Sequence, residues 1–178
     1  MKKILIISLL AFYSLTSIGQ EDLNLSNVLV IAQQDKLEDR YTMEIAMLEL
    51  MRSNDIVAKS SLNILKQGQD PSILASDSIT RKLGNDGIDT YLLISVRGYD
   101  TRFNPSQKLP ELKDELRSGH LFPLWRESAS TVTFTFLFYR NGIPAHYELI
   151  RVRAGGSKDA MMKKLYRKVE KRLQKDWK

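Results

Sequence analysis

The feature that most constrains the fold is a pair of alternating segments joined by a two-residue turn. Residues 131–139 and 143–152 alternate apolar with polar side chains, and the intervening Asn141-Gly142 is typical of a type I′ turn. Together they predict a β-hairpin in which Arg140 pairs with Ile143. In that register three aromatic side chains face the core, each opposite a residue of the second strand: Phe134 with Leu149, Phe136 with Tyr147 and Phe138 with Ala145.

The residues before the hairpin alternate between short apolar runs and helical patterns. Three buried strands are expected from these runs, at 28–32, 55–59 and 90–96. Helices are expected over 36–53, with Asp35 as the cap, and over 70–83, with Pro71 at the first helical position. A β-α-β-α-β order of this kind predicts parallel strands joined by right-handed crossovers.

Apolar side chains recur every three or four residues in the first and the last helix. The first helix carries two such series, which are Leu37, Tyr41, Ile45 and Leu48, and Met43, Met47 and Met51. The methionine series is typical of core filling rather than of a soft-metal site. A last helix, capped by Ser157 and running to Asp176, buries a stripe made of Met162, Leu165, Val169 and Leu173.

These elements predict one α/β domain with a mixed five-stranded sheet. The order is β-α-β-α-β followed by the hairpin and the carboxyl-terminal helix, with helices mainly on one face because one face of the hairpin is partly polar. Residues 98–128 contain only a short predicted helix, over 110–118. A connection of this length is either a functional flap or an ordered surface loop.

The amino-terminal residues have the pattern of an export signal. Lys2 and Lys3 precede an apolar run from Ile4 to Leu15, and the small residues that follow place the predicted cleavage after Gly19. The run is too short to span a bilayer, and we expect a mature domain of residues 20–178 in the periplasm or outside the cell, with no transmembrane span. The chain has no cysteine, which excludes disulfides, thiolate metal ligands, a cysteine nucleophile and a lipidated amino terminus.

Positive charge is concentrated at the carboxyl end. Residues 151–178 hold eleven basic and three acidic side chains, a balance of +8, whereas residues 21–150 carry −4. The last helix is therefore a candidate anion-binding or surface-binding element, with these candidate residues: Lys158, Lys164, Lys168, Lys171 and Arg172. The alternative is a solvated helix face that complements its own dipole and the acidic body. No stacking-aromatic motif accompanies the charge, so nucleic acid is not expected as a partner.

Few residue patterns point to catalysis. The two histidines, His120 and His146, have no ligand partner at helical spacing, and no G-x-S-x-G elbow is present. Carboxylate pairs such as Asp114 with Glu115 are typical of solvated polar patches. The turn from Gly155 to Lys158 could hold a phosphate but lacks the Walker spacing. No metal site, catalytic residue or cofactor is predicted.

One position is favoured as a small-ligand site. Tyr99, Asp100 and Arg102 follow the third predicted strand, and open α/β sheets bind ligands beyond the carboxyl ends of such strands. The alternative is that Asp100 and Arg102 pair with each other at the surface.

The order of elements resembles two exported bacterial α/β domains. The leading strand Val28-Leu29-Val30-Ile31-Ala32, the long helix, the strand ending at Lys59-Ser60-Ser61 and the later Tyr91-Leu92-Leu93-Ile94 are similar to the amino-terminal domain of the translocation protein TolB and the periplasmic part of the curli-secretion lipoprotein CsgG. The resemblance covers about residues 26–175 and departs from the lipoproteins in lacking the lipidated cysteine.

The resemblance implies a non-enzymatic module for binding or assembly in the envelope, whose partner is an envelope protein or an anionic envelope surface. The alternative hypothesis is a different class of function: a small-ligand binder or cofactor-independent enzyme, with its site at the strand ends near Asp100. The oligomeric state is left open.

Overall fold

The structure is a computed structural model that describes residues 23–66, 68–99, 109–119 and 121–177. The predicted signal peptide and its cleavage after Gly19 lie outside the described residues, and so do Asp100, Arg102 and His120.

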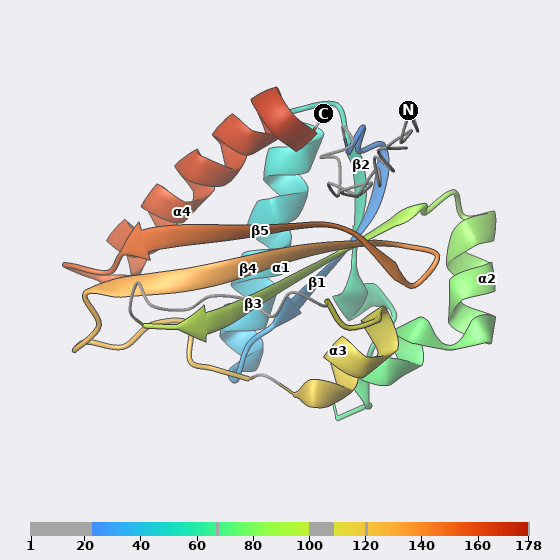
Figure 1. The fold of residues 1–178 in the computed structure, drawn as a ribbon, viewed down its shortest axis with the longest axis horizontal. Coiled ribbons are helices and arrows are strands. Elements are labelled where there is room, and N and C mark those ends of the chain that lie inside the picture. Colours follow the sequence, from blue (N-terminus) through green and yellow to red (C-terminus); the bar gives the residue numbers. More distant parts are fainter. Residues whose placement is uncertain (1–22, 67, 100–108, 120, 178) are drawn as a thin grey trace, which may run out of the picture.

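Five strands form one mixed sheet in the order β2-β1-β3-β4-β5 (Figure 1). The strands are β1 (Asn27–Gln33), β2 (Val57–Ser60), β3 (Thr90–Gly98), β4 (Thr131–Arg140) and β5 (Ile143–Arg153). The helices are α1 (Leu37–Arg52), α2 (Asp77–Asn85), α3 (Leu112–Ser118) and α4 (Lys158–Arg172). β1 pairs in parallel with β2 and β3, whereas β4 is antiparallel to β3 and β5. The predicted fold class and element order are confirmed.

Two apolar cores lie on the two faces of this sheet. The two long helices, α1 and α4, cover one face, where Met43, Met47 and Leu165 are buried with the aromatic side chains of β4. The shorter helices α2 and α3 cover the other face through Leu83 and Leu112 (Figure 1). Helices were expected mainly on one face, and the two long helices do share a face, but α2 and α3 cover the other. The strands of the parallel half are thus covered on both faces, as their continuous apolar runs require.

The hairpin differs from its predicted register by one residue. Arg140 pairs with Ile143 as expected, but Phe138 then pairs with His146 because a β-bulge intervenes beside Pro144. Proline has no N–H to give to the ladder, and bulges and edge strands are where a sheet accepts it. The shift turns Ile150 into the core opposite Phe134, instead of Leu149. The predicted core face of β4 is correct, and the predicted partners on β5 are wrong.

The first helix begins one residue later than predicted and is capped differently. Lys36, not Asp35, is the N-cap, and it makes no side-chain cap hydrogen bond. Of the two apolar series, the methionines are fully buried, whereas Leu37 and Tyr41 are 52% and 58% exposed. The methionine series therefore faces the sheet because the helix must bury one stripe only.

The predicted helix over 70–83 is two elements. Asp70 caps a 3₁₀ helix, Pro71–Ala75, by accepting a hydrogen bond from the Ser72 amide at 2.8 Å. Ser76 is extended, with ψ of 148°, which breaks the chain direction before α2 begins. The short helix predicted over 110–118 is confirmed as α3.

A fully buried carboxylate fastens α1 to the sheet. Glu44 is completely buried, and its carboxylate accepts hydrogen bonds from the Ala32 amide at 3.0 Å and from the hydroxyls of Ser60 and Ser61 at 2.5 and 2.7 Å. Arg40 donates to the same carboxylate at 3.1 Å. The amide and hydroxyl donors lie at the carboxyl ends of β1 and β2, so the Glu44 side chain joins α1 to both strands.

A buried tryptophan closes the carboxyl-terminal end. α4 continues into a π-helical turn, Leu173–Trp177, and the Trp177 ring packs on Phe136 and Phe138 at centroid distances of 5.4 and 4.9 Å. Its indole Nε1 donates to Glu148 at 3.1 Å. The ring is wholly buried.

Replacing the buried carboxylate should destabilise the domain strongly. Glu44→Ala leaves Arg40 and several donors without their acceptor, and we expect it to lower the free energy of unfolding by about 3–5 kcal/mol. Urea denaturation measures the change, with the exposed Glu49→Ala on the same helix as the control. An effect of Glu44→Ala no larger than that of the control would contradict the fastening role.

Removing the indole should loosen the carboxyl-terminal turn. We expect Trp177→Ala to lower the free energy of unfolding by about 3–5 kcal/mol because it leaves a cavity beside two phenylalanines. Trp177→Phe should cost less, since it keeps most of the apolar volume and loses the hydrogen bond to Glu148. Trp125→Phe, at a half-buried position, is the matched control. Equal midpoints for all three variants in a thermal melt would show that the turn is not part of the core.

Candidate functional site

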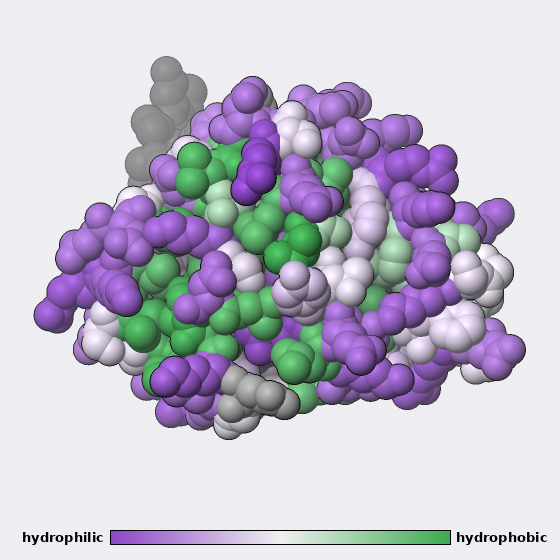
Figure 2. Space-filling view, turned by 180° about the vertical axis from the view of Figure 1, so that it is seen from behind, coloured by the Kyte–Doolittle hydropathy of each residue, from purple (hydrophilic) through white to green (hydrophobic). Residues whose placement is uncertain are grey.

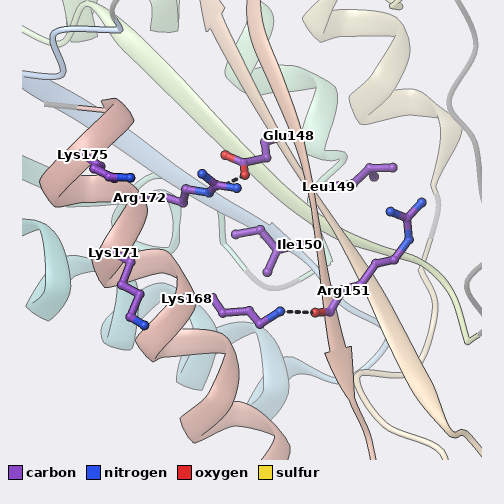
Figure 3. Close-up of a pocket in the computed structure, with 8 residues that line it drawn as sticks. All are labelled: Glu148, Leu149, Ile150, Arg151, Lys168, Lys171, Arg172 and Lys175. Atoms are coloured by element: carbon purple, nitrogen blue, oxygen red, sulfur yellow. Dashed lines mark hydrogen bonds and ion pairs between the residues drawn. The ribbon is translucent and has the colours of Figure 1, made fainter.

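A basic groove runs between α4 and the outer edge of β5 (Figure 3). Its volume is about 540 Å³. It is lined by five cationic side chains, one carboxylate and two apolar residues of β5, namely Arg151, Lys168, Lys171, Arg172, Lys175, Glu148, Leu149 and Ile150. Figure 3 shows the helix lysines along one side of the groove and the strand along the other.

Two further hollows extend the groove along the same helix and strand. They share Lys164 and Lys168, and they add Arg153 and Arg167 to the lining. The three hollows together are lined by eight cationic side chains, whereas their acidic side chains are Glu148 and Glu170. This continuous surface, defined by these hollows, is the basic face.

Two lysines of the basic face cover the backbone of the edge strand. Lys168 Nζ donates to the carbonyl of Arg151 at 2.9 Å, and Lys164 Nζ donates to the carbonyl of Arg153 at 3.5 Å. β5 is the last strand of the sheet, so these carbonyls point away from β4. Lysines over an exposed edge are one way in which proteins keep strands from pairing with other chains.

Arg172 is tied to the fold. Its guanidinium pairs with Glu148 and with Asp176, at 2.6 Å in each case. Burial raises the pKa of the Glu148 carboxyl, and the neighbouring Arg172 and the Trp177 hydrogen bond oppose that rise. By contrast, no described residue pairs with the side chains of Lys171 or Lys175. These two lysines are the cations of the groove that are available to a partner.

The structure separates Lys158 from the other predicted anion-binding residues. Lys158 forms an ion pair with the buried Asp39, which joins the start of α4 to α1. Ser157 caps α4 as predicted, by accepting a hydrogen bond from the Ala160 amide at 3.2 Å. Lys158 thus helps to dock the helix, whereas Lys164, Lys168, Lys171 and Arg172 all line the basic face.

Of the predicted strand-end site, the described residues include Tyr99. Its hydroxyl donates to the carbonyl of Pro123 at 2.5 Å, and the Arg126 guanidinium lies 4.3 Å from the ring centroid. Phe122 meets the ring edge-on, at 6.5 Å. Burial raises the pKa of the Tyr99 hydroxyl. The side chain therefore holds the segment after α3 against the end of β3.

A row of buried polar side chains crosses the sheet beneath α3. This row was not predicted from the sequence. Gln33, Ser95 and Thr135 are register neighbours on β1, β3 and β4. The hydroxyls of Ser95 and Thr135 and the Gln33 Oε1 are buried without a hydrogen-bond partner. In the sequence, the one sign of this row is that polar residues interrupt otherwise apolar strands.

An ion pair lies beside this row. Glu115, expected in a solvated polar patch, is buried and pairs with Arg97 of β3, and this corrects the sequence prediction. The correction arises because α3 packs its Glu115 face on the sheet together with Leu112 and Leu116. Desolvation lowers the pKa of Arg97.

A separate hollow, outside the basic face, is apolar and lies beside α1. It is lined by Leu37, Tyr41, Leu62 and Leu65 together with polar neighbours. From behind, the molecule shows hydrophobic side chains gathered among hydrophilic ones (Figure 2). This hollow thus differs in chemistry from the basic groove: charged side chains dominate the lining of the groove beside β5, whereas apolar side chains dominate here.

Neither a metal-binding cluster nor a membrane-spanning helix is found among the described residues. They contain no group of three or more histidine, aspartate or glutamate side chains placed to hold a metal ion. Among the helices described, none combines the length and the apolar character that a membrane crossing needs.

Comparisons with known proteins find likenesses in solved structures only. No protein-family model and no curated protein matches the chain. The PelC dodecamer from Paraburkholderia phytofirmans is similar at 10% identity, over 87% of this chain and 89% of that chain, with a TM-score of 0.45. The lipoprotein GNA1162 from Neisseria meningitidis is similar at 12% identity, over 84% of this chain and 98% of that chain, with a TM-score of 0.41. Likenesses at this level imply no shared activity, and the resemblance to TolB and CsgG stays a prediction.

His146 should make the stability of the domain depend on pH. Burial against Phe138 lowers the pKa of its imidazole below the usual 6.5, and the nearby Asp176 opposes that shift. The folded state therefore disfavours the proton, and stability should fall as the pH drops from about 7 to about 5.5. Glu148, whose pKa is raised, contributes in the opposite direction, because the folded state loses stability as that carboxyl ionises.

The variant His146→Gln should reduce this loss of stability at low pH. Urea midpoints measured at several pH values give the slope for each protein. If His120→Gln removes the slope and His146→Gln leaves it, the assignment to His146 is wrong.

Proposed function

We propose that the chain is an exported, non-catalytic binding or assembly module of the cell envelope that holds an anionic partner on the basic face. The observation that carries the proposal is the groove between α4 and β5, where five cationic side chains converge and two of them have no partner among the described residues. Export is proposed from the amino-terminal pattern of Lys2, Lys3 and the apolar run after them.

The shape of the basic face is better suited to a partner that enters a groove than to a flat membrane surface. A helix that binds in a membrane interface presents an apolar face to the lipid. The apolar side chains Leu165 and Val169 of α4, with Leu173 of the turn that follows, are fully buried against the sheet. The helix therefore offers charge alone, beside a strand edge.

The second candidate function is the binding or conversion of a small polar ligand at the strand ends. It is supported by the unpartnered Oε1 of Gln33 and the unpartnered hydroxyls of Ser95 and Thr135 beneath α3, near the carboxyl ends of β1 and β3. Ligand-induced thermal shifts across a metabolite panel test it, with Ser95→Ala and Thr135→Val as variants. A panel without any shift would argue against this function.

Charge reversal on the basic face should abolish binding to a polyanion. We expect the purified mature domain to be retained on immobilised poly-L-glutamate at low salt and to elute as the salt rises, because exposed charges are screened. The triple variant Lys164→Glu, Lys168→Glu and Lys171→Glu should pass through. Arg172 and Lys158 are left unchanged because both hold the fold together.

The matched control carries the same change of charge at exposed lysines on other elements. This variant combines Lys66→Glu, Lys82→Glu and Lys113→Glu, and it should be retained nearly as well as the wild type. Equal loss of retention in both triple variants would mean that net charge alone governs binding, and it would refute a role for the groove.

A further inference from the structure

We propose that the partner binds as an extended acidic peptide strand that adds to the edge of β5, within the basic groove. This inference rests on the proposed function and names the partner class and the mode of binding. Strand addition gives affinity through main-chain hydrogen bonds and specificity through side chains.

The edge of β5 has the geometry that strand addition needs. β5 spans Ile143–Arg153, and within the described part of the chain β4 is the strand that pairs with it. The carbonyls of Arg151 and Arg153 point away from β4, and in an antiparallel strand the N–H and C=O of one residue point to the same side. By the same two-residue alternation, the amide and carbonyl of Leu149 also face outward.

The groove places an incoming strand next to α4. Ile150 and the stems of the lysines provide apolar lining, and the ammonium groups of Lys168 and Lys171 lie across from the strand (Figure 3). A strand paired to β5 would lie about 4.8 Å from it, inside the groove. Its side chains would alternate, so that every second one turns toward the lysines.

The two lysines on the edge make pairing selective for acidic strands. An incoming strand must displace Lys168 and Lys164 from the carbonyls of Arg151 and Arg153. If the strand carries carboxylates, each displaced ammonium gains a carboxylate and each carbonyl gains a backbone N–H. A neutral or basic strand offers the lysines no such exchange, so the edge stays covered.

The opposite edge of the sheet lacks these properties. β2 spans only four residues, Val57–Ser60. Its Lys59 pairs with Asp86 at 3.0 Å, so that side chain is already neutralised. The end of β2 is also held by Glu44, through Ser60. Length and charge therefore both favour β5 as the docking edge.

Peptide binding followed by amide exchange tests the inference. The probe is a peptide of about nine residues that alternates glutamate with threonine or valine, which matches the length of the edge. We expect saturable binding and slower exchange of the Leu149 and Arg151 amides, read residue by residue by NMR. The same peptide with glutamine in place of glutamate should bind about tenfold more weakly or worse.

Two further reagents separate strand pairing from simple charge attraction. An acidic peptide of the same sequence, N-methylated at alternate residues, keeps its charge and cannot pair along the edge, so it should give no amide protection. The double variant Lys164→Gln and Lys168→Gln should lose most of the preference for glutamate over glutamine, while its circular dichroism spectrum stays unchanged.

Each outcome decides between the two proposals. Retention on poly-L-glutamate without peptide protection of the β5 amides, or equal binding of the N-methylated peptide, overturns strand addition and leaves the proposed function standing. Equal protection by the glutamine peptide overturns the selection for acidic strands. Absence of both retention and peptide binding overturns the proposed function itself.

Discussion

The carboxylate of Glu44 is the interaction on which the parallel half of the molecule depends. It is a buried charge that receives hydrogen bonds from β1, from the end of β2 and from Arg40 of its own helix. A buried charge is tolerated only when such partners are present, and its removal leaves those partners unsatisfied. The position of α1 on the sheet is therefore set by one polar contact as well as by the methionine stripe beside it.

The antiparallel half is organised around the edge of the sheet at β5, which lysines of α4 cover. Among the described strands β5 has a neighbour on one side, β4, and the fold places α4 where its lysines reach the outward carbonyls of Arg151 and Arg153. The carboxyl-terminal turn secures this arrangement, since Trp177 is inserted beside Phe136 and Phe138 of β4 and its indole Nε1 donates a hydrogen bond to Glu148 of β5. The charge that makes the chain basic is thus concentrated on one groove, and some of it serves to cover backbone.

The outcome of the individual predictions follows from how local their causes are. The turn at Asn141-Gly142 and the cap at Ser157 depend on adjacent residues, and both were predicted correctly. The bulge beside Pro144 was missed, because the choice between pairing registers depends on which residues of β5 the core accepts. Glu115 was placed in solvent because its burial depends on α3 packing against Arg97 of a distant strand.

By itself the sequence determined the element order, the α/β class, the methionine stripe of α1 and the accumulation of positive charge after residue 151. These properties arise from hydrophobic periodicity and turn chemistry, which act over a few residues. Only the tertiary structure decided which of the cationic side chains have partners within the fold. Lys158 and Arg172 are paired within the fold, Lys164 and Lys168 cover an edge, and Lys171 and Lys175 face the groove. Their partners come from α1, β5 and the carboxyl-terminal turn, and contacts between elements so far apart in the chain exist only once the sheet has formed.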